Sequence, residues 1–148
     1  MAIAKGAGTE IIRSIHLDDI GSTQKPVIFG IRHHIYTVLS VICYAKALNA
    51  AGDWVTMFLQ GYDSSAGTTD LPIYIFKQEM QVSQTFVWDN KFSFNGCEPT
   101  DFTGPVDSEA KQDAIADQGG ATQVLYIDAE NASDQFAIWC TFIDQNNE

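Results

Sequence analysis

Cysteine and histidine are the side chains in this chain best suited to nucleophilic chemistry or metal binding. Cys43 and Cys140 stand within apolar runs, which is typical of thiols that pack as small hydrophobic groups. Cys97 follows a Gly and precedes an acidic residue, a setting that does not favour a reactive thiolate. His33 and His34 are adjacent, so on a strand they point to opposite faces and cannot easily share a metal ion. We therefore predict no catalytic residue, no cofactor and no metal site among these groups.

Two acidic clusters could supply oxygen ligands to calcium. The first lies in one predicted helical segment and the second at a predicted turn: Asp107, Glu109, Asp113 and Asp117, and Asp128, Glu130, Asn131 and Asp134. Neither cluster matches the calcium loop of twelve residues with a central Gly and a terminal Glu. A solvated acidic face is the favoured interpretation, and a calcium site is the alternative.

Four aromatic side chains could stack on sugar rings: Trp54, Tyr62, Trp88 and Trp139. All lie in predicted strands or at strand ends, where packing in the core is the more common outcome. The sequence contains no Gly-Xaa-Ser-Xaa-Gly motif and no glycine pattern typical of nucleotide binding. A carbohydrate-binding module is thus an alternative hypothesis, and we do not expect an enzyme.

Composition and charge limit the kinds of protein that this chain can be. The 148 residues are 45% hydrophobic and 18% charged, which fits one folded domain. The formal net charge is −11, and residues 92–148 hold one basic side chain against eleven acidic ones. That balance disfavours nucleic acid as a partner.

The longest apolar stretch, Ile35–Leu48, is shorter than the ~20 residues of a membrane-spanning helix, and no signal peptide is evident. We expect no membrane partner and synthesis in a cytoplasm.

The pattern of apolar residues predicts an antiparallel, all-β sandwich, jelly-roll-like, with about 7–8 strands and one short helix. Residues 1–9 are expected to form a flexible N-terminal arm, and residues 10–148 a single domain with an acidic insertion at 97–122. The strands are expected from Glu10 and over Val27–Ile31, Ile35–Leu48, Trp54–Tyr62, Pro72–Phe76, Thr85–Trp88, Phe92–Phe94, Gln123–Ile127 and Phe136–Ile143.

Turn residues suggest how some of these strands connect. Asn49–Gly52 predicts an antiparallel hairpin between Ile35–Leu48 and Trp54–Tyr62. Asp89 and Asn90 form a tight-turn signal between the next two short strands. In the insertion, Asp107–Gln118 predicts a helix with Asp107 or Ser108 as its N-cap.

Several predicted strands are apolar on both faces, although a two-layer sandwich buries only one face of each sheet. In Phe136–Ile143, for example, Phe136 and Ile138 alternate with Ala137 and Trp139. The second face requires a cover, either the inserted helix or a neighbouring subunit. We favour the neighbouring subunit and expect a homo-oligomer or a symmetric assembly of many copies.

The order of features resembles small all-β virion structural proteins of tailed bacteriophages, the kind that decorate or cement capsids or act as head and tail accessories. The resemblance rests on residues 34–96 and 123–143 and does not extend to the insertion. Its features are an apolar strand into a hairpin, a short strand, a turn into the next strand and a closing apolar strand: His34–Ile42 with Trp54–Leu59, Ile73–Phe76, Phe86–Phe92 and Phe136–Ile143.

The resemblance implies a structural, non-catalytic role in a virion, with neighbouring capsid or other virion proteins as partners. The first hypothesis is a capsid decoration or cement subunit, and the alternative within that class is a head–tail or tail accessory protein. The apolar strand faces and the N-terminal arm would make the contacts. The candidate interface residues are Ile3, Ile11, Ile12, Ile15, Tyr36, Tyr44, Tyr74, Phe76 and Trp139.

Overall fold

The computed structural model describes residues 8–63, 68–99, 107–115 and 120–147, and it is an antiparallel β-sandwich with one short helix. This confirms the predicted fold class. The elements in chain order are β1 (Thr9–Ile20), β2 (Lys25–Phe29), β3 (His34–Ala47), β4 (Trp54–Asp63), β5 (Thr68–Glu79), β6 (Thr85–Trp88), β7 (Phe92–Asn95), β8 (Cys97–Pro99), α1 (Glu109–Ile115), β9 (Gly120–Thr122), β10 (Val124–Ala129) and β11 (Gln135–Asn146).

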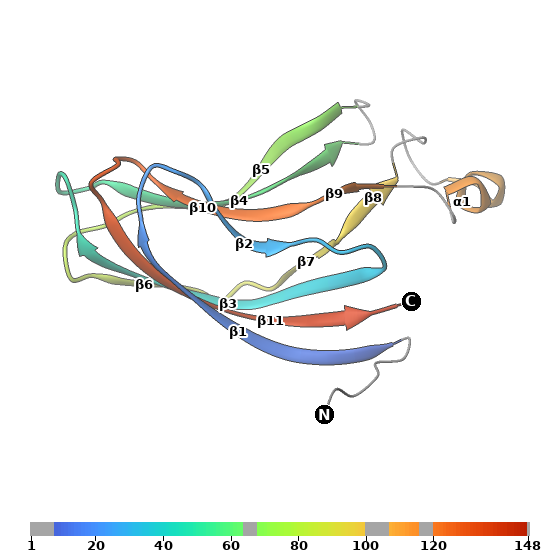
Figure 1. The fold of residues 1–148 in the computed structure, drawn as a ribbon, viewed down its shortest axis with the longest axis horizontal. Coiled ribbons are helices and arrows are strands. Elements are labelled where there is room, and N and C mark those ends of the chain that lie inside the picture. The colour runs from blue at the N-terminus through green and yellow to red at the C-terminus, as the bar shows by residue number, and fades with distance from the viewer. Residues whose placement is uncertain (1–7, 64–67, 100–106, 116–119, 148) are drawn as a thin grey trace.

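Two sheets form the layers of the sandwich (Figure 1). Sheet A has the order β1-β11-β3-β6, and β7 also pairs with β3. Sheet B has the order β2-β10-β4-β5, and β8 pairs with β9 in a small third sheet. The core lies between the two large sheets, where Phe136, Ile138 and Val41 of sheet A and Met57 and Ile127 of sheet B are buried.

The predicted hairpin between Ile35–Leu48 and Trp54–Tyr62 is wrong. These segments are β3 and β4, and they lie in different sheets: β3 pairs with β11, β6 and β7, whereas β4 pairs with β10 and β5. The turn after β3 carries the chain across the sandwich. Turn residues report only that the chain reverses, and they do not determine whether the next strand pairs or crosses to the other layer.

The turn predicted at Asp89 and Asn90 does not form a hairpin either. The strands on its two sides, β6 and β7, both pair with β3 and follow each other along the same edge of that strand. The segment between them interrupts one edge strand of sheet A. Together β6 and β7 occupy the fourth strand position of sheet A.

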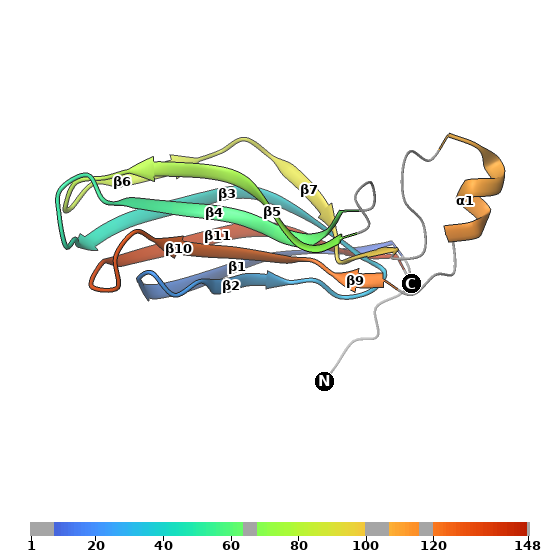
Figure 2. The ribbon, with the colours of Figure 1, turned by 90° about the horizontal axis from the view of Figure 1, so that it is seen from above.

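The insertion contains the predicted helix and a strand pair that the pattern did not predict. Ser108 is the N-cap, because its Oγ accepts a hydrogen bond of 3.2 Å from the backbone N–H of Lys111. Cys97 pairs with Thr122 and Glu98 with Ala121, so β8 and β9 close the base of the insertion. Figure 2 shows α1 beyond the ends of the strands, where it covers neither large sheet. The helix is therefore not the cover that the second strand faces require.

Candidate interaction faces

The best-placed cysteine and histidine side chains serve packing and hydrogen bonding. Cys43 and Cys140 are buried in the core, and burial raises the pKa of each thiol to about 12. The Nδ1 atom of His34 lies 2.6 Å from the buried Asp144 carboxylate, whereas His33 is exposed at a left-handed φ of 67°. Within the described residues, no three or more His, Cys, Asp or Glu side chains are arranged to hold a metal ion.

The acidic turn between β10 and β11 is not the solvated face that the sequence suggested. Asp134 is buried and accepts hydrogen bonds from the backbone N–H groups of Asn49 at 2.7 Å and Asn131 at 3.0 Å. Asp53 is also buried and accepts a hydrogen bond of 2.8 Å from the Asn131 side chain, which lowers the pKa of Asp53. Burial instead raises the pKa of Asp134. These carboxylates fasten together the two turns that cross between the sheets.

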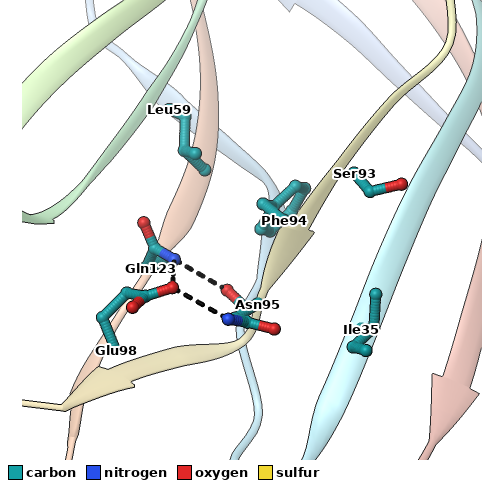
Figure 3. Close-up of a pocket in the computed structure, with 7 residues that line it drawn as sticks. All are labelled: Ile35, Leu59, Ser93, Phe94, Asn95, Glu98 and Gln123. Atoms are coloured by element: carbon teal, nitrogen blue, oxygen red, sulfur yellow. Dashed lines mark hydrogen bonds between the residues drawn. The ribbon is translucent and has the colours of Figure 1, made fainter. Parts of the chain in front are cut away.

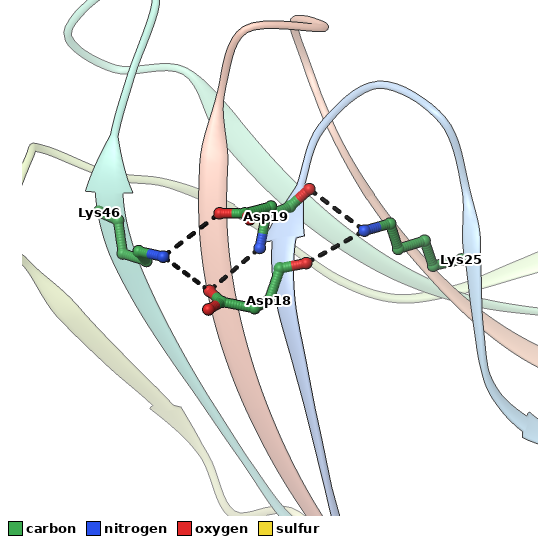
Figure 4. A network of polar contacts seen from close by, with 4 residues as sticks. All are labelled: Asp18, Asp19, Lys25 and Lys46. Atoms are coloured by element: carbon green, nitrogen blue, oxygen red, sulfur yellow. Dashed lines mark hydrogen bonds and ion pairs between the residues drawn. The ribbon is translucent and has the colours of Figure 1, made fainter.

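A second polar cluster closes one end of sheet A (Figure 4). The Lys46 ammonium group of β3 lies 2.9 Å from Asp18 and 3.3 Å from Asp19, both at the end of β1. Lys25 of β2 donates to the backbone carbonyl oxygens of the same two aspartates. The Lys46 hydrogen bond is the main cause of the lowered pKa of Asp18. The cluster therefore neutralises charge at the border of the sheet.

The outer face of sheet A carries a row of mostly apolar side chains across four strands. The strand registers place His16 of β1 opposite Trp139 of β11, Trp139 opposite Ile42 of β3, and Ile42 opposite Val87 of β6. The imidazole of His16 stacks on the Trp139 indole, with ring centroids 4.5 Å apart and an interplanar angle of 14°. All four side chains are exposed, including Trp139 at 42% and Val87 at 54%. We call these four residues the sheet A row.

The surroundings of the sheet A row are uncharged. Along the described strands of this face, charged side chains stand only near the two ends: Glu10 at one end, and Lys46 with its partners Asp18 and Asp19 at the other. Hydroxyl groups between them pair across strands: Ser14 with Thr141 at 3.0 Å and Thr37 with Ser93 at 2.9 Å between oxygen atoms. The 12 residues of β11 and four strand columns give a face of roughly 40 by 19 Å. That is roughly 750 Å², close to one partner's share of a standard protein interface.

The outer face of sheet B differs in being aromatic and hollowed. Tyr126, Phe58 and Tyr74 lie opposite one another on β10, β4 and β5, and the Phe58 ring centroid lies 5.5 Å from that of Tyr126 and 5.8 Å from that of Tyr74. Beside this aromatic row, the Lys77 ammonium group sits 4.5 Å from the centre of the Trp54 ring. We call the depression next to Tyr74 the sheet B hollow; it is lined by Gln24, Trp54, Thr56, Phe58, Gln60, Pro72, Tyr74 and Asp128.

Another hollow lies between the sheets at the end where β7 and β8 meet (Figure 3). Its polar side chains satisfy one another. The Gln123 amide donates to the Asn95 carbonyl oxygen at 3.0 Å and to Glu98 at 3.3 Å, and the Asn95 amide donates to Glu98 at 2.9 Å. The polar groups of this hollow therefore hydrogen-bond to one another rather than standing open to a ligand.

The predicted interface residues separate into exposed and buried groups. Ile12, Tyr44 and Trp139 line the outer face of sheet A, and Tyr74 stands on that of sheet B, so all four are placed to contact a partner. Ile11 is exposed near the open end of β1.

The remaining predictions do not describe an accessible surface. Tyr36 and Phe76 are buried and Ile15 packs against the core, because each falls on the inner side of its strand's alternation. The interface assignment is wrong for Tyr36 and Phe76. Ile3 lies outside the described residues.

The aromatic residues proposed for sugar stacking do not come together. Trp54 lies on the outer face of sheet B and Trp139 on that of sheet A, whereas Trp88 packs against Phe76 with ring centroids 5.7 Å apart. The side chain of Tyr62 lies outside the described part of the chain. Sequence reasoning placed Asp128 in an acidic cluster and Tyr74 among the interface residues, but it missed that Asp128 lies beside an aromatic row. The i, i+2 spacing of Tyr126 and Asp128 indicates a shared face, but their neighbours depend on strand register.

Comparisons with known proteins give distant structural neighbours only. No family model matches the chain, and no curated protein matches it. A Bacillus endospore appendage protein, from a family described as disulfide-linked pili, has a TM-score of 0.45 and 13% identity, covering 100% of this chain and 97% of its own. An infectious bursal disease virus protein of the Gt strain has a TM-score of 0.45 and 9% identity, covering 99% of this chain and 34% of its own. A chain from T=1 particles of that virus has a TM-score of 0.42 and 8% identity, covering 99% and 38%. Similarity this low does not transfer a function.

Proposed function

We propose that this chain is a non-catalytic structural subunit that packs against further copies of itself through the outer face of sheet A. The observation that carries the proposal is the sheet A row, a band of exposed side chains that no described element covers. Uncharged sheet faces pack against one another at a spacing of about 10 Å.

Charge favours this face over the rest of the surface. Copies with a net charge of −11 repel one another, and a contact through acidic side chains would increase that repulsion. Only near its ends does the described face carry charged side chains, and Lys46 at one end is already paired with Asp18 and Asp19. The paired hydroxyls of Ser14 and Thr141 also lower the cost of removing the face from water.

Within this role, we propose a virion location, as a capsid decoration or cement subunit of a phage-like shell. The resemblance of the strand order to small phage virion proteins supports this location, and residues 1–9 would reach a neighbouring subunit. A head–tail or tail accessory protein is the alternative in the same class. A purely carbohydrate-binding module is the alternative from another class.

The test is self-association of the full chain, measured by sedimentation velocity over a range of concentrations. Val87→Glu places a charge in the sheet A row, so we expect it to weaken the association constant about tenfold or more. Val82→Glu is the matched control, because Val82 is 55% exposed, nearly the same as Val87 at 54%, but lies in the loop before β6. We expect Val82→Glu to leave association unchanged.

Two outcomes would overturn the proposal. One is a wild-type chain that remains monomeric at the highest concentration measured. The other is an equal loss of association in Val87→Glu and Val82→Glu, since that would reflect added charge in general rather than contact through sheet A.

A further inference from the structure

We propose that the sheet B hollow is a binding site for a pyranose unit of a glycan. This site is separate from the assembly face, because the hollow opens on the outer face of the other sheet. It does not depend on self-association, so the chain would combine a packing face with a face that binds saccharide.

The polar groups of the hollow are the first argument. Asp128 lines the hollow, and its Oδ1 atom is buried without a hydrogen-bond partner among the described residues; burial also raises the pKa of this carboxyl group. An unpartnered buried oxygen is costly, so a ligand hydroxyl that donates to it gains free energy once rotation of the carboxyl group turns that oxygen toward the hollow. Gln24 and Gln60 also line the hollow, and so does Thr56, whose hydroxyl already donates to the backbone carbonyl oxygen of Phe76. Amide, hydroxyl and carboxyl groups close together suit a ligand that carries several hydroxyl groups.

The rings beside Asp128 are the second argument. Tyr74 is 67% exposed and stands at the edge of the hollow, supported by Phe58 at a centroid distance of 5.8 Å. A projecting ring held by another ring offers an apolar face for the C–H groups of a sugar, while its polar tip stays in water. A second depression, lined by Trp54, Thr56, Tyr74 and Lys77, adjoins the hollow and shares Tyr74 with it. A glycan of more than one unit could therefore extend past the tyrosine.

Charge and shape argue against two other occupants. A cationic ligand would also suit a carboxylate among aromatic rings, but the Lys77 ammonium group already occupies the Trp54 ring face at 4.5 Å and would repel it. A second copy of the chain packed flat across sheet B would leave the buried Asp128 oxygen without a partner. A small ligand with hydroxyl groups avoids both difficulties.

The experiment is a glycan-array screen of the full chain, followed by titration of the best oligosaccharide with amide chemical shifts recorded by NMR. We expect saturable shifts at Trp54, Tyr74 and Asp128. Tyr74→Ala should weaken affinity about tenfold, whereas Tyr74→Phe keeps the ring and should retain most of it. Ile73→Ala is the matched control, because Ile73 is the next residue on the same strand and is 56% exposed.

The outcomes separate this site from the assembly role. Titrations run in the Val87→Glu background exclude effects of self-association on the shifts. The proposal is overturned if no array glycan produces a saturable shift, or if Tyr74→Ala and Ile73→Ala bind equally well. It is also overturned if choline or a lysine derivative binds at these residues and saccharides do not, since the hollow would then be a cation site.

Discussion

The two outer faces of this sandwich are built from the same kind of antiparallel strands but differ in shape and charge. On sheet A, the row from His16 to Val87 crosses four strands, and its surroundings are uncharged. On sheet B, an aromatic row borders a hollow that holds the buried oxygen of Asp128. A broad uncharged face suits a large partner, whereas a hollow beside an unpartnered acceptor suits a small polar ligand. Surface chemistry, not strand content, thus separates a packing face from a binding face.

The comparison breaks if the outer face of sheet A contributes to the stability of the single chain. Phe136→Ala removes a fully buried ring from the inner side of sheet A and should lower the free energy of unfolding by about 3–5 kcal/mol. Ile12→Ala removes a highly exposed side chain from the outer side and should change it by less than about 0.5 kcal/mol. Urea unfolding in the Val87→Glu background measures both. Similar losses in the two variants would mean that the outer face is part of the folded core.

The comparison also requires that the crossing turns hold sheet A and sheet B in one fixed position relative to each other. Asp134→Ala leaves the backbone N–H groups of Asn49 and Asn131 without their acceptor and should cost about 2–3 kcal/mol in unfolding free energy. Because these groups belong to the turns that cross between the sheets, hydrogen exchange should increase in both sheets together. Asp89→Ala, at an exposed loop position, is the control and should cost less than about 0.5 kcal/mol. Faster exchange in one sheet alone would contradict the role assigned to Asp134.

The smallest expected effect sharpens the assignment of the sheet B hollow. Burial raises the pKa of Asp128 above its ordinary value of 3.8, so the folded chain holds this proton more tightly than the unfolded chain does. Asp128 therefore contributes stability that is fully present below about pH 3.8 and is lost as the pH rises through the raised pKa. Asp128→Asn lacks this loss, so its stability relative to wild type should increase from acid to neutral pH by about 1 kcal/mol or less. Denaturant titrations at several pH values measure the difference in unfolding free energy between Asp128→Asn and wild type. A difference that does not change with pH would show that folding leaves the pKa of Asp128 unchanged.

Local pattern was sufficient for most strands. β6 covers Thr85–Trp88 as the sequence predicts, and β3 and β4 differ from their predicted bounds by one residue or little more. Strand formation depends on side chains alternating between two faces, and that alternation is visible within a few residues of the chain. The apolar character of both strand faces was visible for the same reason, and it led to the expectation of a partner surface.

Partner strands and the contents of each face were decided by the tertiary structure. The sheet A row joins His16, Ile42, Val87 and Trp139, and the sheet B hollow joins Gln24, Trp54, Tyr74 and Asp128. No local pattern aligns residues so far apart, because a shift of one residue in any register moves each side chain to the opposite face. The sequence by itself determined that strands form and that they carry excess apolar surface. Only the packing of one sheet on the other chose which side chains that surface presents.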